Sequence, residues 1–278
     1  MGVLDVVHAG PFGGAELILD LRRAEFVSPY GAVGILSSVA AHVTAGGQIR
    51  TLCPEQEGCR RYLAASGMLQ HLAELGELEG DGGLRSTNPS WTAGTVLPLT
   101  SLSAESEIAG TWHQFEDRLR SLLSRTGDGN GPKLGPIGST LFEICQNVFD
   151  HAGEGRIAWV AAQQYLNRWT QMPFIEIAIG DAGCGIRTSL GSTHSEVLHG
   201  TDSEAIVRAL RGLSRKPGYS GNGYGVLQDA ARNLDGSFLL QSGTGVVRRP
   251  RRKSLIRTDR VLSWPGTRVQ VCLTCCNP

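Results

Sequence analysis

A carboxylate and a carboxamide one helical turn apart are the side chains of this sequence best placed to do chemistry together. Glu143 and Asn147 fall in a predicted helix over residues 141–152, and a spacing of four puts both on one face. From there both side chains can reach the same bound ion or water molecule. The polar stripe continues through Asp150 and His151, so a plain solvated helix face is the alternative interpretation.

The opposite side of this helix must pack on something apolar. Its apolar residues recur at helical spacing and are Leu141, Ile144, Cys145, Val148 and Ala152. This pattern predicts that the helix lies on a sheet, with its polar stripe directed away from the core.

A second group of functional residues follows a predicted strand. Two strands are expected at residues 157–165 and 174–179, and the second leads into Asp181, Gly183, Gly185 and Ile186. An acidic residue at a strand end, followed by glycines that let the backbone approach a ligand, is typical of a binding site. Calcium loops and ordinary turns also contain this Asp-x-Gly-x-Gly pattern.

Two further segments complete the pattern. A glycine-rich stretch opens a predicted helix over residues 226–234, whose free N–H groups suit a phosphate. Its residues are Gly221, Gly223, Tyr224, Gly225 and Val226. Near the end of the chain, Gly266 and Thr267 begin a closing strand with alternating apolar residues.

In order, these four segments resemble the N, G1, G2 and G3 boxes of the GHKL ATPases, which include gyrase, Hsp90, histidine kinases and MutL. The resemblance covers about residues 100–278, and its first box is most similar to those of anti-sigma serine kinases and histidine-kinase-like ATPases. It implies a Bergerat-type α/β sandwich, a mixed sheet with helices on one face, which binds Mg-ATP under a flexible lid. The lid corresponds to residues 187–220.

The resemblance also implies a role for each residue. Glu143 is the expected catalytic base, Asn147 the Mg²⁺ ligand, and Asp181 the acceptor for the amine of adenine, supported by Thr267. Guanine presents an oxygen at that position, so the carboxylate favours ATP over GTP. The remaining expected nucleotide-binding residues are His151, Gly183, Gly185, Ile186, Lys216, Gly221, Gly223, Tyr224, Gly225 and Val226.

One position departs from the family pattern. Asp150 stands where related kinases often have Lys or Arg, which leaves His151, Arg187 or Lys216 to neutralise phosphate charge.

The first part of the chain alternates strand and helix signals. Strands are expected at 15–21, 26–27 and 49–53, and helices at 31–45 and 55–68. This order resembles the STAS domain of anti-sigma-factor antagonists. The resemblance lacks the usual phosphoacceptor, because Ser28 is followed by Pro29 and Tyr30 rather than by a Ser/Thr pair. A small α/β module that simply packs or dimerises is the alternative.

A change of composition suggests the domain boundaries. We expect the STAS-like module at residues 1–78, a linker with the first strand of the next domain at 79–104, and the ATP-binding domain at 105–278. The 278 residues carry a formal net charge of zero, so no global field favours nucleic acid or an anionic membrane. No apolar run approaches the roughly 18 residues that span a bilayer, and seven cysteines suit a reducing compartment, so a cytoplasmic location is expected.

Two functions fit these observations. The first is a Mg-ATP-binding signalling regulator with slow ATP hydrolysis or protein kinase activity, whose partner or second copy binds the N-terminal module. The second is a non-catalytic switch in which ATP or ADP changes binding or dimerisation. A basic run between residues 246 and 261 could grip nucleic acid or an acidic partner, but a solvated hairpin is the simpler interpretation.

Overall fold

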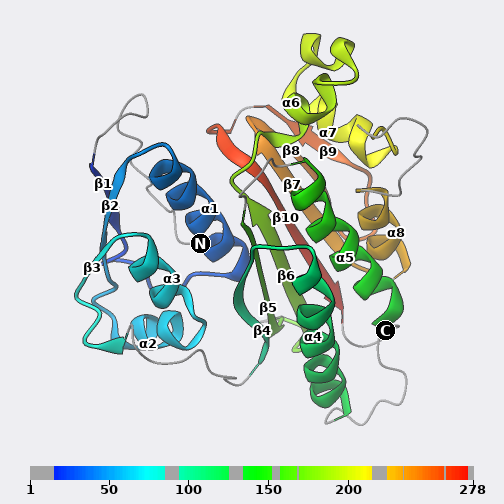
Figure 1. The fold of residues 1–278 in the computed structure, drawn as a ribbon. Coiled ribbons are helices and arrows are strands. Elements are labelled where there is room, and N and C mark those ends of the chain that lie inside the picture. The colour runs from blue at the N-terminus through cyan, green and yellow to red at the C-terminus, as the bar shows by residue number, and fades with distance from the viewer. Residues whose placement is uncertain are drawn as a thin grey trace.

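The structure is a computed structural model that describes residues 16–84, 94–124, 134–151, 157–167, 169–214, 224–233, 235–259 and 261–274. The strands of this part form two sheets, flanked by helices (Figure 1). The small sheet has the order β1-β2-β3, and the large sheet has the order β4-β5-β6-β10-β7-β8-β9. The predicted α/β class is confirmed.

The N-terminal module is built around the small sheet. Its strands are β1 (Glu16–Asp20), β2 (Gln48–Leu52) and β3 (Glu77–Glu79), and its helices are α1 (Pro29–Thr44), α2 (Glu57–Ala65) and α3 (Met68–Leu75). Strand β2 lies in the middle and pairs in parallel with both neighbours. Parallel neighbours need a crossover, and α1 supplies it between β1 and β2.

One predicted detail of this module is wrong. Phe26 and Val27 form no strand; the ring of Phe26, which is 56% exposed, stacks on Tyr62 with ring centroids 5.8 Å apart, and Val27 is only 2% exposed. The helix expected over residues 55–68, broken by a glycine, is α2 followed by α3. The break lies at Gly67, which adopts a left-handed conformation at φ 89°.

The large sheet is antiparallel throughout its described strands, so the expected mixed sheet is wrong. Its strands are β4 (Thr95–Leu102), β5 (Ala158–Leu166), β6 (Pro173–Asp181), β7 (Ser237–Gly243), β8 (Gly245–Arg249), β9 (Ile256–Thr258) and β10 (Trp264–Thr274). The first strand expected within residues 79–104 is thus β4, an edge strand that pairs with β5.

One face of the large sheet is covered by α4 (Ser106–Ser124), α5 (Leu134–His151) and α8 (Gly225–Asn233), as Figure 1 shows. Three members of the predicted apolar stripe of α5 are confirmed: Ile144, Cys145 and Val148 are buried in the same cluster as Ile177 and Ile179 of β6. The side chain of Leu141 and all of Ala152 lie outside the described residues. At one end of the sheet the chain adds α6 (Gly185–Gly191), the 3-10 helix η2 (Ser195–His199) and α7 (Asp202–Leu210).

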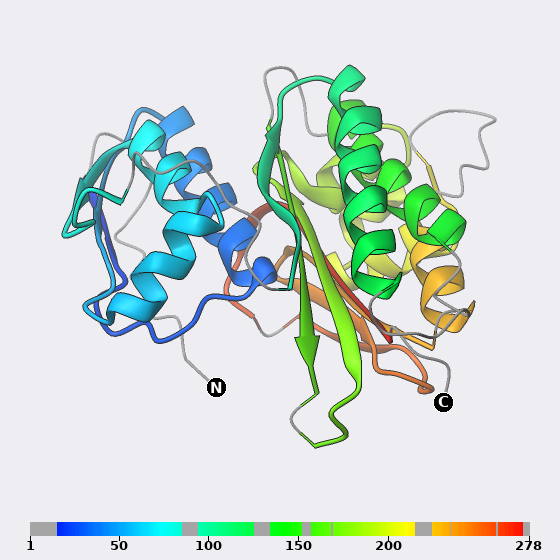
Figure 2. The same cartoon turned by 90° about the horizontal axis from the view of Figure 1, so that it is seen from below.

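The other face of the large sheet is covered by α1 of the N-terminal module, whereas α4, α5 and α8 share one face. Figure 2 shows α1 on the side of the sheet opposite to α4 and α5. Along β5, Ala158, Val160 and Ala162 belong to the cluster with α4 and α5, whereas Trp159 and Ala161 belong to the cluster with α1. Successive strand residues point to opposite faces, so both faces are apolar and both are buried.

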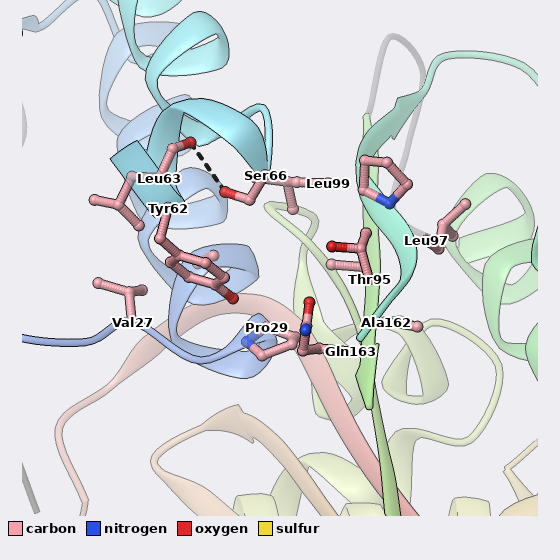
Figure 3. Close-up of a pocket in the computed structure, with 13 residues that line it drawn as sticks. Val27, Pro29, Tyr62, Leu63, Ser66, Thr95, Leu97, Leu99, Ala162 and Gln163 are labelled. Atoms are coloured by element: carbon pink, nitrogen blue, oxygen red, sulfur yellow. Dashed lines mark hydrogen bonds between the residues drawn. The ribbon is translucent and has the colours of Figure 1, made fainter. Parts of the chain in front are cut away.

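The contact between the N-terminal module and the sheet is tightly packed. A cavity of about 20 Å³ remains between Tyr62 and Ser66 on one side and Thr95 and Gln163 on the other (Figure 3). That volume accommodates about one water molecule, so this space is not a substrate site.

Among the described residues, no helix combines the length and the apolar character needed to cross a membrane.

Candidate functional site

Asp181 and Thr267 meet at one end of the large sheet. Asp181 is the last residue of β6, and Thr267 lies on the adjacent strand β10, where Arg268 pairs with Gly180. Both side chains are buried, with exposed fractions of 5% and 6%. The structure therefore brings together the two residues expected to contact adenine, which are far apart in the sequence.

Ser242 links this pair to the start of α6, and the sequence interpretation missed it. The Ser242 hydroxyl accepts from the Ile186 N–H at 2.9 Å and from the Thr267 hydroxyl at 3.3 Å, and it donates to the Gly266 carbonyl at 3.0 Å. Its single donor and both its acceptor positions are thereby used. The only sequence signal was a polar residue at the end of an apolar strand.

Glycines let the loops close around Asp181. Its Oδ1 accepts from the Gly183 N–H at 2.6 Å. A Cβ on Gly266, where φ is 68°, would lie 2.2 Å from the Asp181 carbonyl oxygen. A Cβ on Gly185, where φ is 77°, would lie 2.9 Å from Ser242 Oγ. Both positions combine a left-handed backbone with a close approach, which only glycine allows without strain.

Tyr224 completes this cluster from the start of α8. Its hydroxyl lies near Thr267 and Asp181, and burial, followed by the nearby charge of Asp181, raises the pKa of Tyr224. The phenol therefore stays neutral in the physiological range. Gly225 and Val226 follow directly as the first residues of α8. We call Asp181, Ser242, Thr267, Tyr224 and the loop that begins at Gly183 the Asp181 cluster.

The polar stripe of α5 approaches the same end of the sheet. Helix α5 ends at His151, and the chain returns as β5, whose first residue, Ala158, pairs with Asp181. Glu143 and Asn147 are half-buried on this helix. In the described part of the chain, the Asn147 side-chain nitrogen is buried without a hydrogen-bond partner. A buried unpaired amide nitrogen is costly and, being a donor, calls for an acceptor such as a water or phosphate oxygen; a cation would have to use the Asn147 oxygen instead.

Four of the expected binding residues cannot be placed. Lys216, Gly221 and Gly223 lie outside the described residues, as does the side chain of His151.

Arg187, one of the three residues that could neutralise phosphate charge, makes an ion pair within the fold. Its Nε lies 2.7 Å from Asp202 Oδ1, and its guanidinium also donates to the Gly200 carbonyl. Asp202 accepts in addition from the backbone and the hydroxyl of Thr244, both at 2.8 Å. Arg187 therefore ties α6 to α7 and to the β7–β8 turn.

Most of the expected lid is a docked part of the fold. Helix α7 begins with a capping box between Thr201 and Glu204, and Asp259 accepts from the Ser203 N–H at 2.7 Å and the Ser203 hydroxyl at 2.6 Å. Ile206 of α7 is fully buried. Helix α7 is thus anchored to the core, while much of the segment between α6 and α7 is exposed.

The basic run folds as a β8–β9 hairpin, as the simpler interpretation predicts. Arg251 and Arg252 both pair with Asp235, with 2.6 Å between the Arg252 guanidinium and the carboxylate. Hydrogen bonds from these two arginines hold the pKa of Asp235 well below its usual range.

The fit of a divalent ion rests on Asn147, because the described residues contain no group of three His, Cys, Asp or Glu able to hold a metal. A single amide ligand suits Mg²⁺, which keeps several waters and is held largely by phosphates. Searches of protein-family models, of curated proteins and of solved structures found no match to the chain.

Proposed function

We propose that the protein is a Mg-ATP-binding, histidine-kinase-like regulator that hydrolyses ATP slowly or phosphorylates a protein. The observation that carries this proposal is the Asp181 cluster, in which a buried carboxylate, a threonine and close-approaching glycines gather beside a helix bearing Asn147 and Glu143. This set matches the residue types that the GHKL resemblance assigns to adenine, Mg²⁺ and the attacking nucleophile. It also supports a Bergerat-type fold.

Each residue has a distinct task in this proposal. Asp181 accepts a hydrogen bond from the amine of adenine. The Thr267 hydroxyl donates its proton to Ser242, so its oxygen lone pairs remain available to accept from the same amine. Asn147 holds Mg²⁺, which when bound draws negative charge from phosphate oxygens. Glu143, one turn earlier on α5, orients or deprotonates the attacking water or hydroxyl.

A non-catalytic nucleotide switch is the second proposal, and the environment of Arg187 favours it. Arg187 is held by Asp202, and Asp150 replaces a basic residue of the related kinases. Two cations that would stabilise charge in phosphoryl transfer are thereby lost. In this second proposal, ATP hydrolysis is accordingly slow or absent, and the nucleotide acts through binding alone.

In both proposals, the catalytic regulator and the non-catalytic switch, the partner is a protein or a second copy of this chain that contacts the N-terminal module. Ile18 on this module is 45% exposed, and Phe26 is 56% exposed. Helix α1 already covers the large sheet, so the partner must use other surfaces of the module. Light scattering with and without ATP tests the homodimer version, which predicts a doubling of mass in one of the two conditions.

Asp181→Asn tests the nucleotide site. Because the Gly183 N–H requires an acceptor, the asparagine oxygen takes that position and its amide nitrogen faces the adenine amine. Loss of a charge-assisted bond of roughly 1.5–3 kcal/mol should weaken ATP binding about ten- to a hundredfold in calorimetry. Asp117→Asn, on the exposed side of α4, is the matched control. Equal ATP affinity in all three proteins, or equal affinity of wild type for GTP, would refute the site.

The fate of the γ-phosphate separates the two proposals. Glu143→Ala should lower turnover by roughly 10²–10⁴-fold with ATP affinity near wild type, whereas Asn147→Ala should weaken Mg-ATP binding itself. With γ-labelled ATP, free phosphate supports hydrolysis, and labelled protein supports a kinase. If wild type binds ATP tightly yet all label stays in ATP over hours, the switch is the correct function.

A further inference from the structure

Helix α1 contacts the back of the Asp181 cluster through three residues of the large sheet. Gly180 precedes Asp181 on β6, Gln241 precedes Ser242 on β7, and Arg268 follows Thr267 on β10. Arg268 pairs with Gly180 on one side and with Gln241 on the other, so the three form one row across adjacent strands. Because successive strand residues face opposite sides, this row lies on the α1 face, directly behind the cluster.

Arg268 is the centre of this row. Its guanidinium donates twice to Gln241 Oε1, from Nε at 3.0 Å and from a terminal nitrogen at 2.6 Å. The same guanidinium lies 4.4 Å from the centre of the Tyr30 ring and 3.7 Å from the centre of the Trp264 ring. Burial lowers the pKa of Arg268, and aromatic stacking compensates part of that desolvation.

Tyr30 attaches the start of α1 to this row. Its hydroxyl donates to Gln241 Oε1 at 3.3 Å, and its backbone N–H donates to the buried carboxylate of Glu176 at 3.1 Å. The carboxylate lies at the positive end of the helix dipole, which stabilises it. Tyr30 therefore fixes the beginning of α1 to β6 and to β7 at once.

Two glycines let the helix approach this closely. A Cβ on Gly34 of α1 would lie 2.4 Å from a terminal nitrogen of Arg268, and a Cβ on Gly180 would lie 2.7 Å from Val33 Cγ1. Neither glycine has a positive φ, so both provide space rather than a special backbone conformation. The helix and the strand ends cannot shift independently, because a packed interface transmits displacement.

We infer that α1 positions the nucleotide site, with Arg268, Gln241 and Tyr30 as positioning residues that couple the N-terminal module to the Asp181 cluster. For its ligand this inference rests on the proposed function. The positioning itself does not depend on that function. The row of Gly180, Gln241 and Arg268 fixes where the neighbouring residues Asp181, Ser242 and Thr267 lie, with or without ATP. By linkage, bound nucleotide strengthens the docking of α1 as much as docking strengthens nucleotide binding.

Hydrogen exchange tests the structural part without nucleotide. The Ile186 N–H is held by Ser242 Oγ and the Gly183 N–H by Asp181, so both report on the cluster. Arg268→Ala should speed their exchange about fivefold or more. Leu119→Ala, at a fully buried position of α4 away from α1, is the control, and it should leave both amides protected. Unchanged exchange in folded Arg268→Ala overturns the inference.

Nucleotide affinity tests the coupling. Arg268→Ala should weaken ATP binding about fivefold or more, and Arg268→Lys, which keeps the charge without the planar stack, should recover part of it. Tyr30→Phe keeps the ring under Arg268 and loses one hydrogen bond, so a loss of about two- to fivefold is expected. If Arg268→Ala fails to fold, Tyr30→Phe decides, and wild-type affinity and exchange in that variant overturn the inference.

The two proposals fail in different ways. If wild type binds no ATP, the proposed function is wrong, while the exchange of Ile186 and Gly183 still tests the positioning role. Wild type, Arg268→Ala, Tyr30→Phe and Leu119→Ala could instead all bind ATP with the same affinity. In that case the proposed function stands, and α1 has only a structural role.

Discussion

Gly266→Ala tests the geometry of the Asp181 cluster most directly. The new methyl group would lie 2.2 Å from the backbone carbonyl oxygen of Asp181 and 2.6 Å from its Oδ1. A side chain could rotate away, but the carbonyl belongs to β6 and cannot move without displacing the strand end. Gly266 also has a φ of 68°, a conformation that disfavours alanine.

The expected cost follows from these two effects. A left-handed conformation costs an L-residue roughly 1–2 kcal/mol, and forcing a methyl group into a packed site costs about 1–3 kcal/mol. Their sum, about 2–5 kcal/mol, is a large fraction of the 5–15 kcal/mol typical of a folded protein. Gly266→Ala should therefore remain folded at 25 °C with a clearly lower free energy of unfolding.

Urea denaturation followed by circular dichroism measures this change. Gly110→Ala is the matched control, because nothing lies within 4 Å of a Cβ at Gly110 in α4. There the same substitution should stabilise the protein by up to about 1 kcal/mol, since alanine favours a helix. The reasoning is refuted if the two variants shift the midpoint in the same direction, or if Gly266→Ala matches wild type.

Three other outcomes follow from single side chains. Cys184 is exposed between Gly183 and Gly185, whereas burial raises the pKa of the Cys145 thiol to about 12, so an alkylating reagent at pH 8 should label Cys184 first among the described cysteines. In a mass-spectrometric time course Mg-ATP should slow the labelling of Cys184. Equal rates with and without Mg-ATP would count against the nucleotide site. Burial raises the pKa of Tyr30 from 10.0 to about 12, so between these pH values the unfolded chain loses a proton that the folded chain keeps. The free energy of unfolding should therefore fall by up to about 1.4 kcal/mol per pH unit as the pH rises through this range. Tyr30→Phe should reduce this slope in urea titrations at pH 9 and 11, and an unchanged slope would contradict the raised pKa of Tyr30. The Ser28 hydroxyl caps α1 by accepting from the Gly31 N–H at 3.2 Å, so intact mass and peptide mapping after incubation with ATP should find no phosphate there, and stoichiometric phosphate would disprove this.

Local patterns predicted much of the fold. The apolar spacing of α5 and the alternation of β10 are properties of neighbouring residues, so the sequence was sufficient for them. The glycines before α6 and near the start of β10 were also predictable, because a left-handed turn requires a specific residue type.

Contacts between distant residues were not predictable in this way. Ser242 bonds Ile186, 56 residues away, and no local pattern marks such a serine. Arg187 was one of three candidates for neutralising phosphate charge, and its ion pair with Asp202, 15 positions away, is not visible in any local pattern. Phe26 has strand-like character, yet its ring packs on Tyr62. In each case tertiary packing decides, and a short window of sequence does not contain it.

The placement of α1 follows from the need to cover both faces of the large sheet. The first residues of β5 are buried without interruption, and a strand of this kind requires apolar partners on both sides. Helices α4 and α5 supply one side; α1 packs on the other, where His71 of α3 also contacts Trp159 of β5. The N-terminal module therefore contributes to the core of the large sheet. On β6, β7 and β10, the residues that α1 covers alternate with residues of the Asp181 cluster. A change in the N-terminal module therefore reaches the Asp181 cluster through the backbone of these three strands.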